Sequence, residues 1–104
     1  MELNKDEALQ IAQTYAAKVR AELDANAEVY LFGSAARGDM QTDSDIDVAV
    51  VSEVFTSDVI SNRVQLMLLS SEINCDIEPH PVLQEDWLHI TPFTREIMRE
   101  GILV

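Results

Sequence analysis

Residues 31–51 read LFGSAARGDMQTDSDIDVAVV, and this stretch decides the fold. The β-forming residues at its start belong to a short run, 28–32, that predicts a strand. Gly33 ends this run and allows the backbone to turn sharply or to approach a ligand closely. Ser34 is suited to cap a brief helical turn, which Gly38 can terminate. A glycine turn that opens a helix presents free backbone N–H groups, which suit a phosphate.

The second half of the stretch predicts another strand, which begins near Ile46 and becomes fully apolar over 48–51. Because side chains alternate along a strand, Asp45 and Asp47 should point to the same face, about 7 Å apart. Two carboxylates so placed repel each other unless a cation lies between them, and oxygen ligands of this kind suit Mg²⁺ bound together with substrate phosphates. If the two strands are antiparallel neighbours, Gly33 and Asp45 fall at the same end of the sheet, where a triphosphate can bridge them.

A Gly-Ser pair followed at this distance by Asp-x-Asp resembles the signature of the DNA polymerase β-like nucleotidyltransferase superfamily. The chain is most similar to its minimal nucleotidyltransferases, the MNT group, which includes the antitoxins of HEPN/MNT toxin–antitoxin pairs. The resemblance covers nearly the whole chain and implies an α/β (α+β) fold, with a small mixed sheet of about three to four strands flanked by helices. We therefore expect residues 1–104 to form one minimal nucleotidyltransferase domain.

The resemblance also implies roles for individual residues. Many members carry an arginine directly after Gly-Ser, whereas this chain has Ala35 there, so that Arg37 is the only cation of the motif. The family's third acidic residue falls on a later strand, predicted here over 74–80. The expected catalytic and metal-binding residues are Asp45, Asp47 and Asp76, and the expected nucleotide-binding residues are Gly33, Ser34, Arg37 and Ser44.

Other titratable residues of the later strand are assigned no catalytic role. Glu78 should share a strand face with Asp76, and we interpret it as an exposed neighbour. His80 and His89 lack metal-ligand spacing with a second His or Cys, so both are interpreted as structural. Cys75 is interpreted as a small packed residue.

The rest of the pattern predicts the element order α-β-α-β-α-β-α. An N-terminal helix should begin at Asn4, with an apolar stripe on one side. A second long helix should open at Thr56 or Ser57. Trp87 and Phe93 should anchor the terminal helices on the sheet. Thr91-Pro92 should start the last helix, and Gly101 should end it in a Schellman-type stop. The apolar stripe of the helix after Thr56 is expected to include Ile60, Val64, Met67 and Leu68.

Composition is that of a globular protein: 47% of the 104 residues are hydrophobic and 25% are charged. No apolar stretch approaches the ~20 residues that span a bilayer, and the acidic, polar N-terminus is unlike a signal peptide. One cysteine fits a reducing compartment, and we expect a cytoplasmic protein without membrane contact. The net charge of −12 opposes direct binding to nucleic acid and also repels a nucleotide, which favours a bridging metal. An acidic surface serves solubility or matches a basic protein partner.

Three functions fit these observations. The resemblance implies an antitoxin that transfers AMP from ATP, with Mg²⁺ or Mn²⁺, to a tyrosine hydroxyl of a basic HEPN-domain toxin. In this mechanism Asp45 and Asp47 hold the metal, while Asp76 joins a second metal, accepts the proton of the hydroxyl, or does both. A small-molecule (aminoglycoside-type) nucleotidyltransferase is an alternative, against which the lack of an acceptor domain argues. A non-catalytic module that masks a toxin is another, against which the complete set of three aspartates argues.

Overall fold

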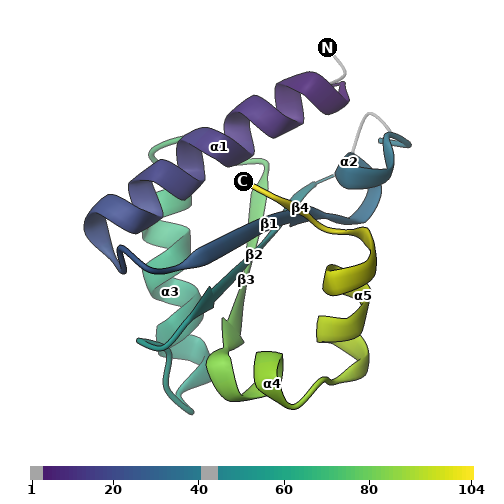
Figure 1. Cartoon of the computed structure of the whole chain (residues 1–104). Coiled ribbons are helices and arrows are strands. Elements are labelled where there is room, and N and C mark those ends of the chain that lie inside the picture. Colours follow the sequence, from purple (N-terminus) through teal and green to yellow (C-terminus); the bar gives the residue numbers. More distant parts are fainter. Residues whose placement is uncertain (1–3, 41–44) are drawn as a thin grey trace.

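A four-stranded mixed sheet lies between two layers of helices in the computed structural model, which describes residues 4–40 and 45–104 (Figure 1). The strand order is β3-β2-β1-β4. The central pair β1 and β2 is antiparallel, β3 runs parallel to β2, and β4 runs antiparallel to β1. This arrangement confirms the expected fold class. The strands are β1 (Glu28–Phe32), β2 (Ile46–Ser52), β3 (Ile77–Leu83) and β4 (Ile102–Leu103).

Five helices cover the two faces of the sheet in the described part of the chain. On one face, α1 and α3 pack over a core of aliphatic residues, and the buried Tyr15 hydroxyl of α1 donates a 2.9 Å hydrogen bond to the Leu66 carbonyl of α3. On the other face, Trp87 of α4 packs on Tyr30 with ring centroids 5.1 Å apart, and α5 buries Ile97. The helices are α1 (Lys5–Glu22), α2 (Gly33–Arg37), α3 (Val59–Ser70), α4 (Gln84–Leu88) and α5 (Pro92–Glu100).

The helix starts at Asn4 and Thr91 are confirmed. The Asn4 side chain accepts a 2.9 Å hydrogen bond from the Glu7 N–H, and the Thr91 side chain accepts one from the Thr94 N–H at 3.1 Å, with proline following the cap. Both bonds satisfy N–H groups that the first turn of a helix leaves without a partner. The end of α5 differs from expectation. Gly101 has φ −72° and ψ 149°, an extended conformation, because the chain continues directly into β4 instead of closing a Schellman motif.

Strand β3 begins and ends three residues later than predicted. Asn74 accepts a 2.8 Å hydrogen bond from the Asp76 N–H through its side chain and a 3.2 Å bond from the Ile77 N–H through its carbonyl. This local turn occupies the residues that were expected to start the strand. Pro79 and Pro81 are nevertheless accommodated in β3, because an edge strand needs hydrogen-bond partners on one side only.

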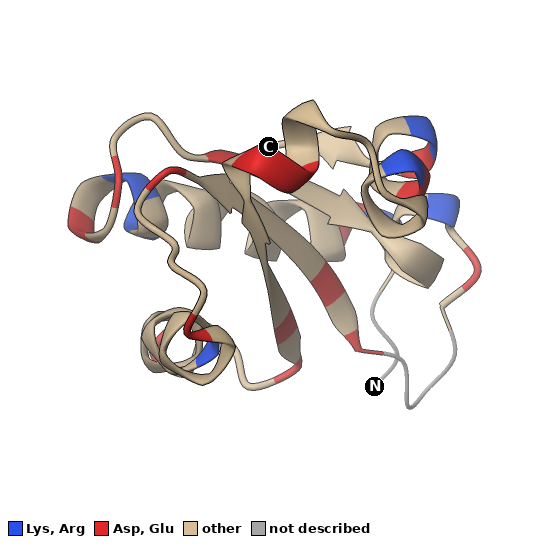
Figure 2. Ribbon diagram, turned by 90° about the horizontal axis from the view of Figure 1, so that it is seen from below, with Lys and Arg blue, Asp and Glu red and all other residues tan. Residues whose placement is uncertain are grey.

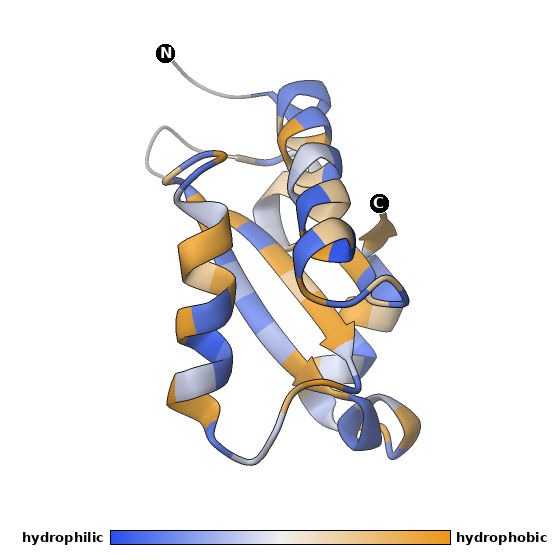
Figure 3. Cartoon of the chain, turned by 90° about the vertical axis from the view of Figure 1, so that its left-hand side faces the viewer, coloured by the Kyte–Doolittle hydropathy of each residue, from blue (hydrophilic) through white to orange (hydrophobic). Residues whose placement is uncertain are grey.

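Helix α3 presents a different side to the core from the one expected. It begins after Asp58, whose side chain caps the Ser61 N–H at 3.1 Å, so the predicted start at Thr56 or Ser57 is early. Its buried residues are Asn62, Leu66 and Ser70, whereas the predicted apolar stripe faces outward. Figure 3, which views the molecule from the left-hand side of Figure 1, shows hydrophobic positions along this helix. None of the helices within residues 4–40 and 45–104 is long and apolar enough to cross a membrane.

Candidate active site

Gly33 and Asp47 lie against each other at one end of the central strand pair. Phe32, the last residue of β1, pairs in register with Asp47, the second residue of β2. Gly33 follows with a φ of +71°, a left-handed conformation, and a Cβ atom built on it would lie 2.6 Å from Asp47 Oδ2. Glycine is therefore required here both by the turn and by the close approach of the carboxylate. The predicted meeting of the glycine turn and the Asp-x-Asp strand is confirmed.

Carboxylates from two parallel strands gather at this end of the sheet. Asp47 pairs in register with Glu78 of β3, and the Ile46 N–H donates a 2.8 Å hydrogen bond to the carbonyl of Asp76. Asp45 and Asp76 thus directly precede the two paired strands. Figure 2 shows the acidic positions at the adjacent ends of these strands.

The nearby carboxylates change the pKa of Glu78. Its contact with the Asp45 carboxyl raises the pKa of Glu78, and burial together with the nearby charges of Asp45 and Asp47 raises it further. The neighbouring His80 acts in the opposite direction. A carboxylate pushed toward its protonated form by other carboxylates is a position where a cation would be stabilising. Glu78, interpreted from the sequence as an exposed neighbour, therefore belongs to the acidic cluster.

His80 is the second residue whose position the sequence interpretation missed. Its Nε2 atom lies 3.1 Å from Asp47 Oδ1. The imidazole is held by two aromatic rings, with centroid distances of 5.1 Å to Phe32 and 5.8 Å to Phe93. Strand alternation alone places residues 78 and 80 on the face of residue 76, but it does not say which residue of β2 lies beside them. A search for a second His or Cys at metal-ligand spacing does not detect a histidine that contacts an aspartate on the adjacent strand.

The remaining predicted site residues lie farther from the contact between Gly33 and Asp47 or have other partners. Asp76 is exposed, one residue before β3. Ser34 is not the helix cap: α2 begins at Gly33, the preceding Phe32 occupies the cap position, and Ser34 lies in the first turn. Arg37, at the other end of α2, pairs with Asp39 at 3.3 Å and with Glu100 of α5 at 3.2 Å. Ser44 lies outside the described residues.

The donor chemistry of the cluster fits a magnesium ion. Asp45, Asp47, Asp76 and Glu78 offer only carboxylate oxygens, the hard ligands that Mg²⁺ takes in proteins. Among the described residues, no three His, Cys, Asp or Glu side chains are already arranged around one metal position. The cluster therefore supplies donor atoms of the right kind, and its side chains would have to adjust before they could coordinate an ion together.

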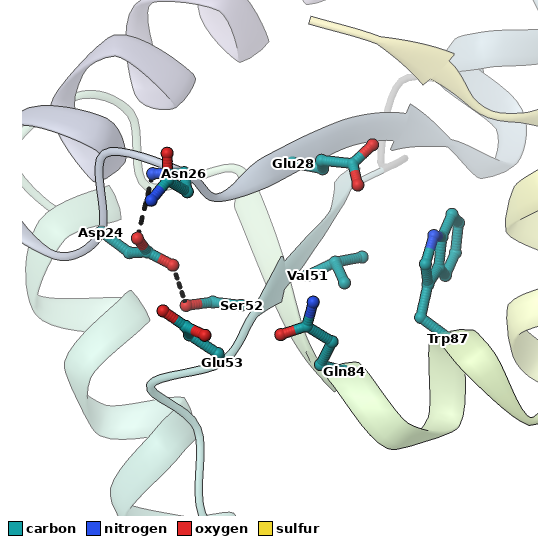
Figure 4. Close-up of a pocket in the computed structure, with 8 residues that line it drawn as sticks. All are labelled: Asp24, Asn26, Glu28, Val51, Ser52, Glu53, Gln84 and Trp87. Carbon is teal, nitrogen blue, oxygen red and sulfur yellow. Dashed lines mark hydrogen bonds between the residues drawn. The ribbon is translucent and has the colours of Figure 1, made fainter.

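A separate pocket of about 140 Å³ lies at the opposite end of β2 (Figure 4). The Ser52 hydroxyl donates a 2.6 Å hydrogen bond to Asp24 Oδ2, and the Asn26 N–H donates one of 2.9 Å to Oδ1. These two bonds lower the pKa of Asp24. They tie the segment after α1 to the end of β2, and we assign the pocket a structural role.

Sequence comparison identifies the family. The model of the nucleotidyltransferase domain matches residues 14–100, and the chain belongs to this family of nucleotidyltransferases. The acidic cluster and the glycine turn both lie within the matched region. No curated protein matches the chain.

Solved structures share the fold. A Sulfolobus solfataricus protein assigned as a nucleotidyltransferase is 23% identical, with 95% of this chain and 80% of that chain covered and a TM-score of 0.65. A chain from a variant of the toxin–antitoxin complex MntA–HpeT is also 23% identical, with coverages of 88% and 69% and a TM-score of 0.59. A chain from a toxin–antitoxin complex with AMP-PNP is 24% identical, with coverages of 97% and 72% and a TM-score of 0.57.

Proposed function

We propose that this nucleotidyltransferase transfers AMP from ATP to a tyrosine hydroxyl of a basic HEPN-type toxin and thereby acts as its antitoxin. The observation that carries the proposal is the approach of Gly33 to Asp47, with Asp45 and Glu78 beside them at the same end of the sheet. A backbone turn free of side-chain bulk and a set of carboxylates are the two components that binding of a metal-bound triphosphate requires.

Asp45 and Asp47 are the proposed metal ligands, and Asp76, just before β3, or Glu78, within β3, would complete the set. The positive charge of a bound Mg²⁺ would offset the charge that develops on the departing pyrophosphate. His80 contacts Asp47 on one side, and the missing side chain of Gly33 makes room for the Asp47 carboxylate itself. The support for this assignment is the donor chemistry of the cluster.

The protein groups then position the reactants. The backbone at Gly33 and Ser34 would bind the β- and γ-phosphates, so that the α-phosphorus faces the acceptor. The acceptor oxygen bonds to the α-phosphorus, the bond from this phosphorus to pyrophosphate breaks, and the hydroxyl proton passes to a carboxylate. Asp76 is the sequence-based candidate for this base. Glu78 is a second candidate, because it pairs in register with Asp47 and contacts Asp45.

The proposed partner is a toxin for two reasons. Chains of toxin–antitoxin complexes share this fold, and one of those complexes contains AMP-PNP, an ATP analogue. The net charge of −12 favours association with a basic protein and opposes contact with nucleic acid. AMP attached to a toxin tyrosine would add a bulky anion and so repel an RNA phosphate from the toxin.

Intact-mass spectrometry tests the proposal. A candidate basic HEPN-type toxin is incubated with the chain, ATP and Mg²⁺, and we expect mass increments of one AMP each on the toxin. Peptide mapping should place them on tyrosine, and EDTA should prevent them. Neutralisation of the toxin without any change in its mass would instead support masking. AMP found on an aminoglycoside but never on the protein would support the small-molecule alternative.

A further inference from the structure

Helix α3 exposes an apolar stripe to solvent. We name it the α3 outer face and define it by four residues at helical spacings of four, three and one, which place them on one side of the helix. A surface helix normally turns such a stripe toward the core, but here Leu66, with Asn62 and Ser70, fills that position. Side chains of the stripe are 47–77% exposed, and its members are Ile60, Val64, Met67 and Leu68.

The α3 outer face borders a pocket that reaches the acidic cluster. This pocket has a volume of about 410 Å³ and is lined by α3, by the loop that follows it and by the start of the edge strand β3. Met67 and Arg63 line it on the helix side, and Asp45 and Glu78 line it on the sheet side. The Arg63 guanidinium lies 3.9 Å from a Glu78 carboxylate oxygen, so the helix surface and the cluster are adjacent. A molecule seated on the stripe could extend along this pocket to the carboxylates.

The charges around the stripe indicate what can cover it. Acidic residues stand at both ends of the helix, Asp58 as its exposed cap and Glu72 just after it, and the half-buried Glu78 lies at the pocket. Glu72 pairs with Lys18 and Glu78 with Arg63, so the excess negative charge around the stripe comes from Asp58 and from the chain as a whole. The whole chain carries −12, with 7 basic against 19 acidic residues. A second copy of the chain or an anionic membrane would bring like charge to this rim, whereas a basic protein would bring opposite charge. Apolar contact framed by complementary charge is typical of a protein–protein interface.

We propose that the α3 outer face is the docking surface for a basic partner protein, which lays an apolar ridge on it and presents its acceptor hydroxyl to Asp45 and Glu78 through the adjoining pocket. The inference rests on the proposed function, since it gives the position from which the acceptor protein reaches the site. It assigns binding of the partner to a surface that is distinct from the nucleotide-binding residues.

Two matched substitutions test this surface. Leu68 in the stripe is 65% exposed, and Leu88 at the end of α4 is 71% exposed. Leu68→Glu and Leu88→Glu therefore add the same charge at equally open leucines, and glutamate is a good helix former. Binding of a basic HEPN-type toxin is measured by calorimetry without nucleotide. We expect Leu68→Glu to weaken binding at least about tenfold and Leu88→Glu to leave it within about twofold. Thermal unfolding should be the same for both variants.

Other outcomes overturn the inference in recognisable ways. Equal binding by Leu68→Glu and wild type, or an equal loss in Leu88→Glu, removes the partner from this face, as does the absence of any complex. A dimer of the chain that Leu68→Glu dissociates would assign the face to a second copy. Mass spectrometry on the same proteins separates this inference from the proposed function. If Leu68→Glu leaves AMP transfer unchanged, the docking surface alone is contradicted. If Leu68→Glu weakens binding but no AMP is transferred even by wild type, the proposed function alone is contradicted.

Discussion

The imidazole of His80 and the carboxylate of Asp47 lie 3.1 Å apart on adjacent parallel strands, and the second oxygen of Asp47 faces Gly33. The carboxylate is thus held on one side by a ring that Phe32 and Phe93 fix in place. On its other side the backbone has no side chain. The contact with His80 fixes the orientation of the Asp47 carboxylate, which we propose as a metal ligand.

Replacement of His80 by alanine should therefore reduce the apparent affinity for Mg²⁺ more than it reduces the stability of the fold. Residues that orient a metal ligand typically contribute about 10–100-fold to metal affinity or activity. We expect His80→Ala to lower the transfer rate within this range and to raise the Mg²⁺ concentration that gives half-maximal activity. His89→Ala is the matched control, because His89 is exposed after α4. An unchanged Mg²⁺ requirement in His80→Ala would return His80 to a purely structural role.

Gly33→Ala and Gly38→Ala separate backbone strain from loss of space. Both glycines have positive φ, +71° and +80°, so alanine at either should cost about 1–2 kcal/mol of unfolding free energy. Only at Gly33 would the added Cβ meet the Asp47 carboxylate, at 2.6 Å; at Gly38 the nearest atom is Lys5 Cδ, at 3.8 Å. We expect Gly33→Ala to lose transfer activity and Gly38→Ala to keep it. Urea unfolding and transfer assays measure the two effects, and equal activity in both variants would contradict the proposed contact.

Asp76→Asn and Glu78→Gln should distinguish the two candidates for the third carboxylate of the site. The variant that removes the base should lose transfer but retain much of its affinity for ATP and Mg²⁺, which calorimetry measures. A loss of nucleotide affinity equal to that of Asp45→Asn would instead make the residue a ligand of the nucleotide-bound metal. A variant with full activity identifies a carboxylate that has neither role.

The Asp24–Ser52 contact predicts a pH dependence of stability. Two hydrogen bonds hold the pKa of Asp24 below its ordinary value of 3.8, so the folded state favours the ionised carboxylate. This contribution is present above the ordinary pKa and is lost as the pH falls through the lowered one. Ser52→Ala should cost about 1 kcal/mol at neutral pH, a moderate value because Asp24 is only partly buried. The cost should shrink in acid. Urea unfolding of Ser52→Ala beside Glu53→Gln measures it, and a cost that persists below the lowered pKa would contradict this origin.

Local signals in the sequence were sufficient for the strand pair that carries the site. Strand β1 has the predicted bounds, and the Gly33 turn lies beside the Asp-x-Asp strand as expected. Both features could be predicted because a turn and a strand alternation depend on residues close together in the sequence. Tertiary contacts decide the orientation of α3. Asn62 is buried because its side chain exchanges hydrogen bonds of 3.1 Å and 2.7 Å with the Thr56 backbone. A helix with apolar residues on two sides gives no periodic signal for which side packs on the core. The approach of Glu78 and His80 to Asp47 depended on the register between β2 and β3, which no short-range pattern encodes.

Transfer from ATP labelled separately in its α- and γ-phosphate tests the central claim most directly. With wild-type chain, Mg²⁺ and the HEPN-type toxin, we predict that the α-label appears on the toxin and that the γ-label leaves with pyrophosphate. Asp45→Asn and Asp47→Asn should lower the α-labelling by at least about a hundredfold. Their unfolding free energy without metal should hold or rise, because each substitution removes a mutually repelling charge. Labelling from the γ-phosphate, or α-labelling by either variant at the wild-type rate, would contradict nucleotidyl transfer at this acidic cluster.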